Sequence, residues 1–229
     1  MRNYLNFAGM IIAEDNYRHK GLRQQLVNQL RAGGFTDERV LAAINAVPRH
    51  VFLDSSFVEY AYSDQPFSIG SGQTISQPST VAVQTGLLAV ESGMKVLEVG
   101  TGSGYQACVL AAMGAKVFSI ERQRNLYFRT KEILEQLPYR VKTFLGDGYE
   151  GLPKYGPFDR VIITAGAPMG PHRLVEQLKP GGIMVIPMDN PAGDGQVMVR
   201  LTKKPDGSLA REEFGNFKFV PMLTGTASD

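Results

Sequence analysis

Three alternate glycines over residues 100–104 follow a short apolar stretch at 95–99 and precede an apolar helix expected over 106–113. Glycine has no Cβ atom, so the backbone can turn sharply there and a ligand can approach it closely. A dinucleotide fingerprint needs glycines at its first, third and sixth positions, but the sixth position here is Tyr105. No Lys–Ser/Thr pair follows, so the turn is not a phosphate-binding loop. The pattern indicates a nucleotide-type ligand without a phosphate cradle, or else an ordinary strand-to-helix turn.

Acidic residues stand at the ends of three consecutive expected strands, at Glu98, Glu121 and Asp147. Ligands of doubly wound sheets bind outside the carboxyl ends of the strands, so these side chains should lie near one another. A carboxylate at Glu121 can accept hydrogen bonds from both hydroxyls of a ribose. Asp147, or the N–H group of Gly148, can reach the edge of an adenine. Any one acid alone could equally be a solvated cap or turn residue, but three together with the glycines favour a site.

The pattern Glu-x-Gly-x-Gly-x-Gly after a strand resembles the first motif of the class I S-adenosylmethionine (AdoMet) methyltransferases. AdoMet carries no phosphate on its nucleoside, and its ammonium group would be held by a carboxylate, here Glu98. The fourth expected strand ends at Thr164, and the small residues at 165–167 leave space for a substrate. The Asn/Asp-Pro-Pro-Tyr motif typical of amino-group methylation is absent at this place.

A second motif lies upstream, in a glycine- and hydroxyl-rich loop expected over residues 63–78. Its segment Gly-Gln-Thr-Ile-Ser-Gln-Pro at 72–78 resembles the protein-L-isoaspartate (D-aspartate) O-methyltransferase family. The resemblance covers about residues 20 to 223. Further matching segments follow the family order at 47–52, 146–148, 157–159, 178–182 and 219–221.

The resemblance implies that Ser76 is the active-site residue, with Thr74 assisting it. The nucleophile would be a substrate carboxylate, which is already ionised at neutral pH, so no general base is required. Catalysis would then come from positioning and from removal of water. The alternative for Ser76 is a cap on the helix that follows Pro78. Ser79 stands where the family usually has a bulky residue, which predicts a more open substrate pocket.

The expected activity is methyl transfer from AdoMet to the free α-carboxyl group of L-isoaspartyl and D-aspartyl residues in damaged proteins and peptides, which initiates repair and leaves S-adenosyl-L-homocysteine. One alternative is a carboxyl methyltransferase of the same lineage that acts on another peptide or natural-product carboxylate. Another is a non-catalytic AdoMet-binding module. The residues expected to bind the cofactor are Gln73, Ile75, Glu98, Gly100, Thr101, Gly102, Ser103, Gly104, Glu121, Arg122, Asp147, Gly148 and Thr164.

The elements that must position these residues alternate between strand and helix, which predicts an α/β fold with a doubly wound, mostly parallel Rossmann-like sheet. Alternating stretches around a Lys-Pro-Asp-Gly turn at 204–207 predict an antiparallel hairpin at one edge. We expect one domain over residues 1–229, divided into N-terminal helices and substrate loop (about 14–92), cofactor-binding sheet (93–190), and edge hairpin with tail (191–229). The expected strands are 95–99, 116–120, 141–145, 158–164, 183–187, 196–202 and 209–220; the expected helices include 17–32, 79–91, 106–113, 125–137 and 171–178.

The composition is that of an ordinary globular domain, with 43% apolar residues and a formal net charge of +2. This balance predicts no broad surface for nucleic acid or membrane. The single cysteine, Cys108, excludes an internal disulfide and is expected to be buried. No metal site is expected, and His19, His50 and His172 are interpreted as surface or capping residues. We expect a cytoplasmic monomer with a loose arm over its first dozen residues.

Overall fold

A computed structural model describes residues 13–168, 170–191, 193 and 195–227. The arm expected at the beginning of the chain lies outside these residues. Within the described residues, no helix is long and apolar enough to cross a membrane.

The core of the fold is a seven-stranded sheet with the order β5-β4-β3-β6-β7-β8-β9. Neighbours from β5 to β7 are parallel, whereas β8 and β9 are antiparallel additions at one edge. This confirms the predicted mostly parallel sheet with an antiparallel hairpin. The strands are β3 (Lys95–Val99), β4 (Lys116–Glu121), β5 (Val141–Leu145), β6 (Phe158–Ile163), β7 (Leu178–Asp189), β8 (Gln196–Lys203) and β9 (Leu209–Phe217).

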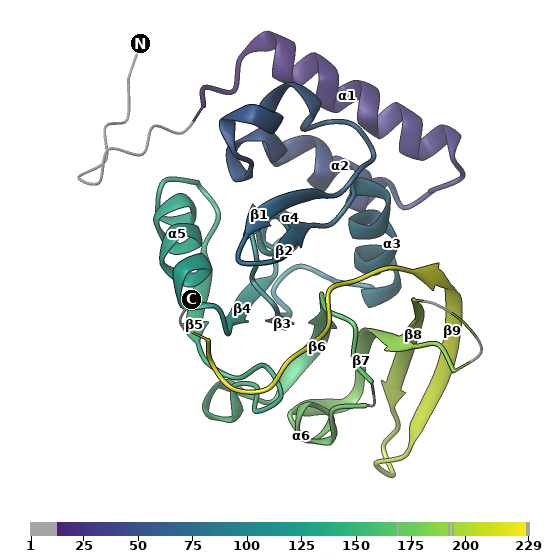
Figure 1. Cartoon of the computed structure of the whole chain (residues 1–229). Helices are drawn as coiled ribbons and strands as arrows, with labels where there is room; N and C mark the ends of the chain where they lie inside the picture. Colours follow the sequence, from purple (N-terminus) through teal and green to yellow (C-terminus); the bar gives the residue numbers. More distant parts are fainter. Residues whose placement is uncertain (1–12, 169, 192, 194, 228–229) are drawn as a thin grey trace.

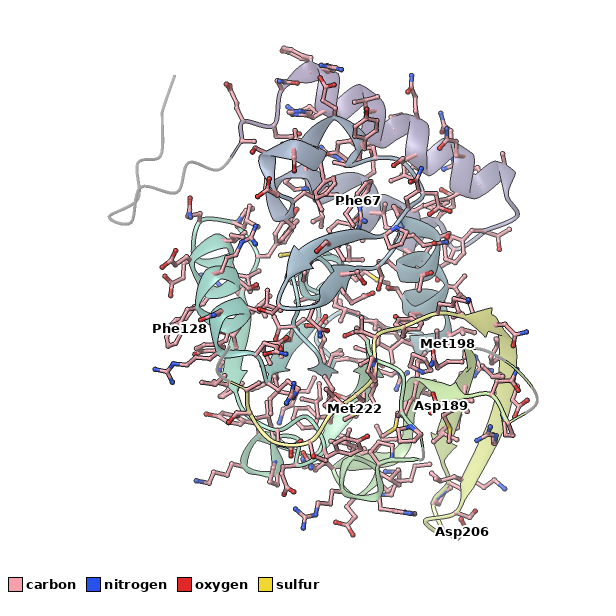
Figure 2. All side chains as sticks on the ribbon, in the orientation of Figure 1. Phe67, Phe128, Asp189, Met198, Asp206 and Met222 are labelled. Carbon is pink, nitrogen blue, oxygen red and sulfur yellow. The ribbon has the colours of Figure 1, made fainter. Side chains whose placement is uncertain are left out.

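Both faces of the sheet are covered, one by the longer helices α3 (Pro78–Leu88), α4 (Tyr105–Ala112) and α5 (Arg124–Glu135) and the other by the short helix α6 (His172–Glu176) and the tail that follows β9. On one face, Val96 of β3 belongs to a core cluster with Leu88 of α3 and Leu110 of α4. Helix α5 packs beside α4. On the other face, the cluster includes Leu174 of α6, near the 3-10 turn η3 (Pro153–Tyr155), and Met222 of the tail. Figure 1 shows this tail crossing from β9 past β6 towards α5, and Figure 2 labels Met222 on it.

The N-terminal elements form a layer above the sheet in Figure 1. Helix α1 (Tyr17–Ala32) begins after Asn16, whose side chain accepts a hydrogen bond from the N–H group of His19. Helix α2 (Glu38–Ala46) is capped in the same way by Asp37. These caps satisfy N–H groups that a helix leaves unpaired at its start. Two 3-10 turns, η1 (Arg49–Phe52) and η2 (Ser55–Tyr60), connect α2 to the next segment.

The segment expected as a loop over 63–78 contains a small hairpin, so that prediction is wrong in part. Strands β1 (Phe67–Gly70) and β2 (Gln73–Ile75) pair antiparallel. Gly70, Ser71 and Gly72 make the turn with φ values of 88, 49 and 66°. Arg129 of α5 donates a hydrogen bond to the carbonyl of Ile69 at 3.1 Å, which ties the hairpin to the sheet domain.

The chain also differs from expectation at the start of β7, which begins at Leu178 rather than at residue 183. Leu178 pairs with Phe158, and the register shifts before Arg160 pairs with Ile183. The Lys-Pro-Gly-Gly segment at 179–182 is therefore an irregular part of the strand, with Gly181 at φ 77°, instead of a stop between two elements. Helix α6 is correspondingly shorter than the predicted helix.

Candidate active site

A cavity opens at the carboxyl ends of the parallel strands, where the glycine turn, the β1–β2 hairpin and the tail meet. It is lined by six parts of the chain that are separated in the sequence. Its lining residues are Gln73, Thr74, Ile75, Ser76, Val81, Gln84, Val99, Gly100, Thr101, Gly102, Ser103, Tyr105, Gln106, Ile120, Glu121, Arg122, Gly148, Thr164, Ala165, Val220, Pro221, Met222 and Leu223.

The glycine turn is held in a backbone conformation that other residues rarely adopt. Gly100 has φ 95°, and a Cβ atom built on it would lie 2.5 Å from Thr164 Oγ1. The Thr164 hydroxyl lies against the carbonyls of Gly100 (2.7 Å) and Val99 (3.0 Å) and can donate a hydrogen bond there. Thr130 donates to the carbonyl of Gly102 at 2.6 Å. These contacts fix the turn so that Gly102 and Ser103 face the cavity at the start of α4.

Glu121, the last residue of β4, lines the cavity and is only 5% exposed. Its Oε2 accepts a hydrogen bond from the N–H of Gly102 at 2.8 Å, and its Oε1 accepts one from the N–H of Gln123 at 2.9 Å. Each carboxylate oxygen has two lone pairs, so both oxygens keep acceptor capacity for a ligand. The side chain is thus anchored in one orientation with two acceptors side by side, as a vicinal diol requires.

Glu98, by contrast, does not line the cavity. It lies inside β3, is fully buried, and accepts a hydrogen bond from Ser119 Oγ. Burial raises the pKa of Glu98 to about 8, so its carboxyl group is protonated at neutral pH. The Ser119 hydroxyl also lies 2.6 Å from that of Thr101, which does line the cavity. The placement does not match the expected carboxylate contact to an ammonium group, and Glu98 reaches the cavity only through Ser119 and Thr101.

Asp147 also stands outside the cavity lining. Its Oδ1 accepts from the N–H of Tyr149 at 2.8 Å, and its Oδ2 accepts from the N–H of Gly225 at 2.6 Å. Arg122, which lines the cavity, donates to the carbonyls of Gly225 (3.0 Å) and Thr224 (3.3 Å). These two side chains hold the tail across the strand ends. Gly148 rather than Asp147 faces the cavity.

Thr74 and Ser76 occupy the junction of two cavities. Both line the cavity described above and also a neighbouring one bounded by residues 216–220. The N-cap position of α3 is occupied by Gln77, and no side chain makes a capping hydrogen bond there. The alternative role of Ser76 as the helix cap is therefore wrong. Thr80 lines the neighbouring cavity, whereas Ser79 Oγ pairs with the amide of Gln77 at 2.9 Å.

Comparison with known proteins places these features in one family. The sequence model described as protein-L-isoaspartate(D-aspartate) O-methyltransferase (PCMT) matches residues 21–227. The chain belongs to this family. It is 54% identical over 210 residues to a protein-L-isoaspartate O-methyltransferase from Cytophaga hutchinsonii, covering 92% of this chain and 94% of that one. A relative from Christiangramia forsetii is also 54% identical, over 92% of this chain and 98% of its own length.

Solved structures of protein-L-isoaspartate O-methyltransferases share the fold. One superposes with a TM-score of 0.79 at 30% identity, covering 87% of this chain, and the chain spans 65% of that longer protein. Another, a protein assigned to the same activity from Plasmodium falciparum and solved with S-adenosyl-L-homocysteine, has a TM-score of 0.76 at 26% identity, covering 90% of this chain and 98% of that one. AdoMet is the cofactor of this isoaspartate methyltransferase chain.

The residues of this methyltransferase that sequence reasoning predicted as a site lie together, with three exceptions. Gly104, Glu98 and Asp147 are outside the cavity lining. Gly104 (φ 88°) is instead the N-cap residue of α4, and a Cβ atom on it would lie 2.9 Å from Thr130 Cγ2. The lining also contains residues that the sequence analysis missed. Val81 and Gln84 lie three apart on one face of α3, a spacing that could have indicated them; of the tail residues Val220, Pro221, Met222 and Leu223, only the first two lie in a segment that resembles the family.

The interpretation of the histidines needs one correction. His172 is exposed as expected, but His50 is completely buried in η1 and close to His19. Cys108 is a buried free thiol, as predicted.

Proposed function

We propose that the chain transfers the methyl group of AdoMet to the free α-carboxylate of L-isoaspartyl and D-aspartyl residues in damaged proteins and peptides, and so initiates repair. The observation that carries this proposal is the position of Thr74 and Ser76, which line both the cofactor-type cavity and its neighbour. A carboxylate that enters from the second cavity meets these hydroxyls at the place where the two cavities join.

The residues of the first cavity fit AdoMet. The anchored Glu121 carboxylate offers acceptors for the ribose hydroxyls. Gly102 and Ser103 bring the cavity to the start of α4, and a helix N-terminus favours the carboxylate of an amino acid. Gly148 and the apolar residue Ile120 leave an apolar wall for a base. We assign Gln73, Ile75, Gly100, Thr101, Arg122 and Thr164 to the remaining walls of the cofactor site.

On the substrate side, the Ser76 hydroxyl donates a hydrogen bond that orients the attacking carboxylate, and Thr74 assists. When bound, AdoMet supplies an electrophilic methyl group on a positively charged sulfur. A carboxylate oxygen forms the new bond to that methyl group, the methyl–sulfur bond breaks, and its electron pair stays on sulfur. No proton is transferred in this step, so the site needs alignment and dryness rather than a base. The tail segment 220–223 forms one wall of the cavity, and its apolar side chains favour exclusion of water from the site.

The product ester collapses to a succinimide without further enzymatic help, and part of it returns to aspartate.

The proposal is tested by offering radiolabelled AdoMet together with an isoaspartyl peptide or with its normal aspartyl twin. Label should enter only the isoaspartyl peptide. Equal labelling of both peptides would refute a repair role. Labelling of another acid only would favour the alternative carboxylate substrate, and AdoMet binding without any transfer would favour a non-catalytic module.

We further propose that the enzyme is a cytoplasmic monomer without nucleic-acid or membrane partners. The near-balanced formal charge of +2 supports the absence of a broad anionic partner. Light scattering coupled to size-exclusion chromatography measures the mass in solution, and fractionation of cells that express the protein tests its location.

A further inference from the structure

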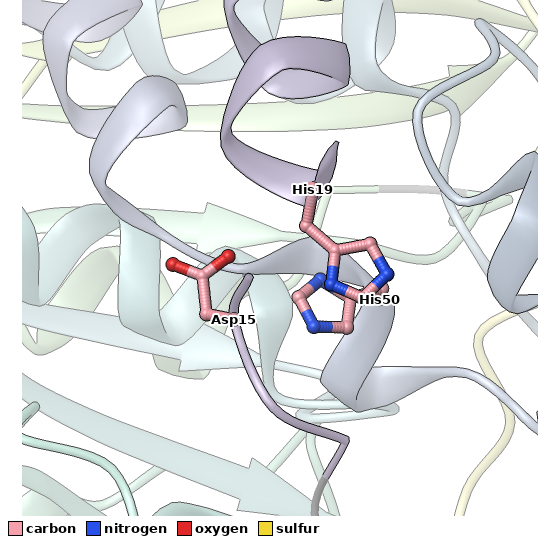
Figure 3. Close-up of side chains that lie close together, drawn as sticks. All are labelled: Asp15, His19 and His50. Atoms are coloured by element: carbon pink, nitrogen blue, oxygen red, sulfur yellow. The ribbon is translucent and has the colours of Figure 1, made fainter. Parts of the chain in front are cut away.

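A second cluster of side chains lies among the N-terminal elements, apart from the cofactor cavity. It contains Asp15 from the segment before α1, His19 from the first turn of α1, and His50 from η1 (Figure 3). One ligand atom from each residue lies within 4.8 Å of the other two. None of the three lines either cavity of the proposed active site.

The ring of His50 holds a buried nitrogen, Nε2, that no well-aligned hydrogen bond from the described residues occupies. The residue is completely buried, and the backbone of Ala13 lies near its ring without a hydrogen bond of good geometry to Nε2. Its Nδ1 lies 2.7 Å from the hydroxyl of Tyr62. That hydroxyl can accept from the ring and also from Arg23 Nη1 at 3.3 Å, because it has two lone pairs. The Tyr62 hydroxyl can pair with either tautomer of His50, and in the tautomer with the proton on Nδ1 the Nε2 lone pair is open to a ligand.

His19 has the same arrangement of protons. Its Nδ1 lies 2.9 Å from the carbonyl oxygen of Glu14, and a carbonyl can only accept, so Nδ1 carries the proton. The Nε2 of His19 therefore also presents a lone pair. A histidine that donates one ring N–H to a carbonyl or hydroxyl oxygen and keeps the other nitrogen free has the tautomer found in metal sites.

Asp15 completes the set with an oriented carboxylate. Arg23 Nη1 and Nη2 donate to its two oxygens at 3.0 and 3.1 Å, which uses one lone pair on each. The other lone pairs stay available. The charge of Arg23 weakens attraction for a cation, and the carboxylate charge of Asp15 offsets it. Two imidazoles and one carboxylate are a ligand set that suits zinc and neighbouring divalent transition metals.

We propose that Asp15, His19 and His50 bind a divalent transition-metal ion, with Zn²⁺ as the reference ion, in a three-ligand site. The two rings are stacked, with centroids 3.8 Å apart and planes at 27°, so their lone pairs do not yet converge on one point. Metal binding turns the His19 ring out of this stack. His19 is half-buried and partly open to solvent, whereas His50 is completely buried. The bound ion fastens the segment before α1 to η1 and stabilises the N-terminal layer.

The test uses the full chain without a histidine tag, because a tag would bind the same ions. Zn²⁺ is titrated by calorimetry, and Co²⁺ is titrated by its visible d–d absorption. We expect one ion per chain and a higher melting temperature with Zn²⁺. His19→Ala and Asp15→Asn should each weaken binding at least tenfold. His172→Ala removes the third histidine of the chain, which is exposed on α6, and should bind as the wild type does.

The proposal is overturned if the wild type shows no stoichiometric binding, or if His19→Ala or Asp15→Asn binds with wild-type affinity. Loss of binding in His172→Ala would also overturn it, because the site would then be elsewhere. His50→Ala is not needed, since that residue is buried and the variant can fail to fold. Binding of S-adenosyl-L-homocysteine to each variant reports an intact cofactor site independently of the metal, so failure of this inference leaves the proposed methyl transfer untouched.

Discussion

Replacing Glu98 by glutamine should change how the stability of the protein depends on pH. Burial raises the pKa of Glu98 from 4.5 to about 8 in the folded state. Between those pH values, the folded protein binds one more proton at this group than the unfolded chain does. The free energy of unfolding therefore falls as the pH rises through this window, and glutamine removes the effect because it does not titrate.

The magnitude follows from linkage. One proton corresponds to a slope of at most about 1.4 kcal/mol per pH unit, reached between roughly pH 5.5 and 7 and lost above pH 8. Glutamine keeps an acceptor for Ser119 and nearly the same volume. Any cost of burying its amide group is independent of pH, so it shifts the whole curve without changing its slope.

The assay is urea unfolding at several pH values between 5 and 8.5, analysed as the difference between Glu98→Gln and the wild type. Glu176→Gln is the matched control, since Glu176 is an exposed glutamate on α6 and the substitution also replaces a carboxyl group by an amide. We expect the difference to change with pH only for Glu98→Gln. Parallel curves for Glu98→Gln and the wild type would refute the assignment of a protonated, buried carboxyl group.

Other substitutions test the site directly. Glu121→Ala should weaken AdoMet binding by about 1.5–3 kcal/mol, because it removes a charged acceptor, and calorimetry that finds unchanged affinity would remove Glu121 from the site. Ser76→Ala should lower kcat for methylation of an isoaspartyl peptide more than it lowers AdoMet affinity, whereas the control Ser79→Ala should change neither. If Ser76→Ala lowers AdoMet affinity more than kcat, the role of Ser76 is structural. Gly100→Ala should lower both the melting temperature and cofactor affinity, because its Cβ atom would lie 2.5 Å from Thr164 Oγ1 at φ 95°, and a wild-type melting temperature would contradict this.

The parallel sheet was predictable because its strands are covered on both faces and read as Val/Ile-rich runs bounded by glycine and proline. The predicted range 141–145 is that of β5, and the predicted range 95–99 is that of β3. The β1–β2 hairpin was missed because its strands have only four and three residues and their turn is rich in glycine and serine. So short a segment shows no clear alternation.

The two glutamates expected at strand ends, Glu98 and Glu121, show which information the sequence does not contain. Glu121 is the last residue of its strand and faces the cavity, whereas Glu98 lies one residue inside its strand, where a sheet covered on both faces buries every side chain. A shift of one position thus separates a ligand acceptor from a neutral interior group. The segment at 219–221 was recognised by its resemblance, but the contact between Asp147 and Gly225 that fixes the tail could not be predicted, because it joins residues 78 positions apart.

Because the tail is the last part of the cofactor site in the sequence, it is also the last part of the site to be synthesised. The ribosome releases the chain from its N-terminus, and domains fold as their segments emerge. Residues 220–223 line the cavity, and the N–H group of Gly225 donates a hydrogen bond to the second carboxylate oxygen of Asp147; this tail emerges after every strand of the sheet. A growing chain can therefore complete its sheet before it has a closed place for AdoMet. Any stabilisation by AdoMet that depends on the tail is therefore available only to chains that have been translated through residue 225.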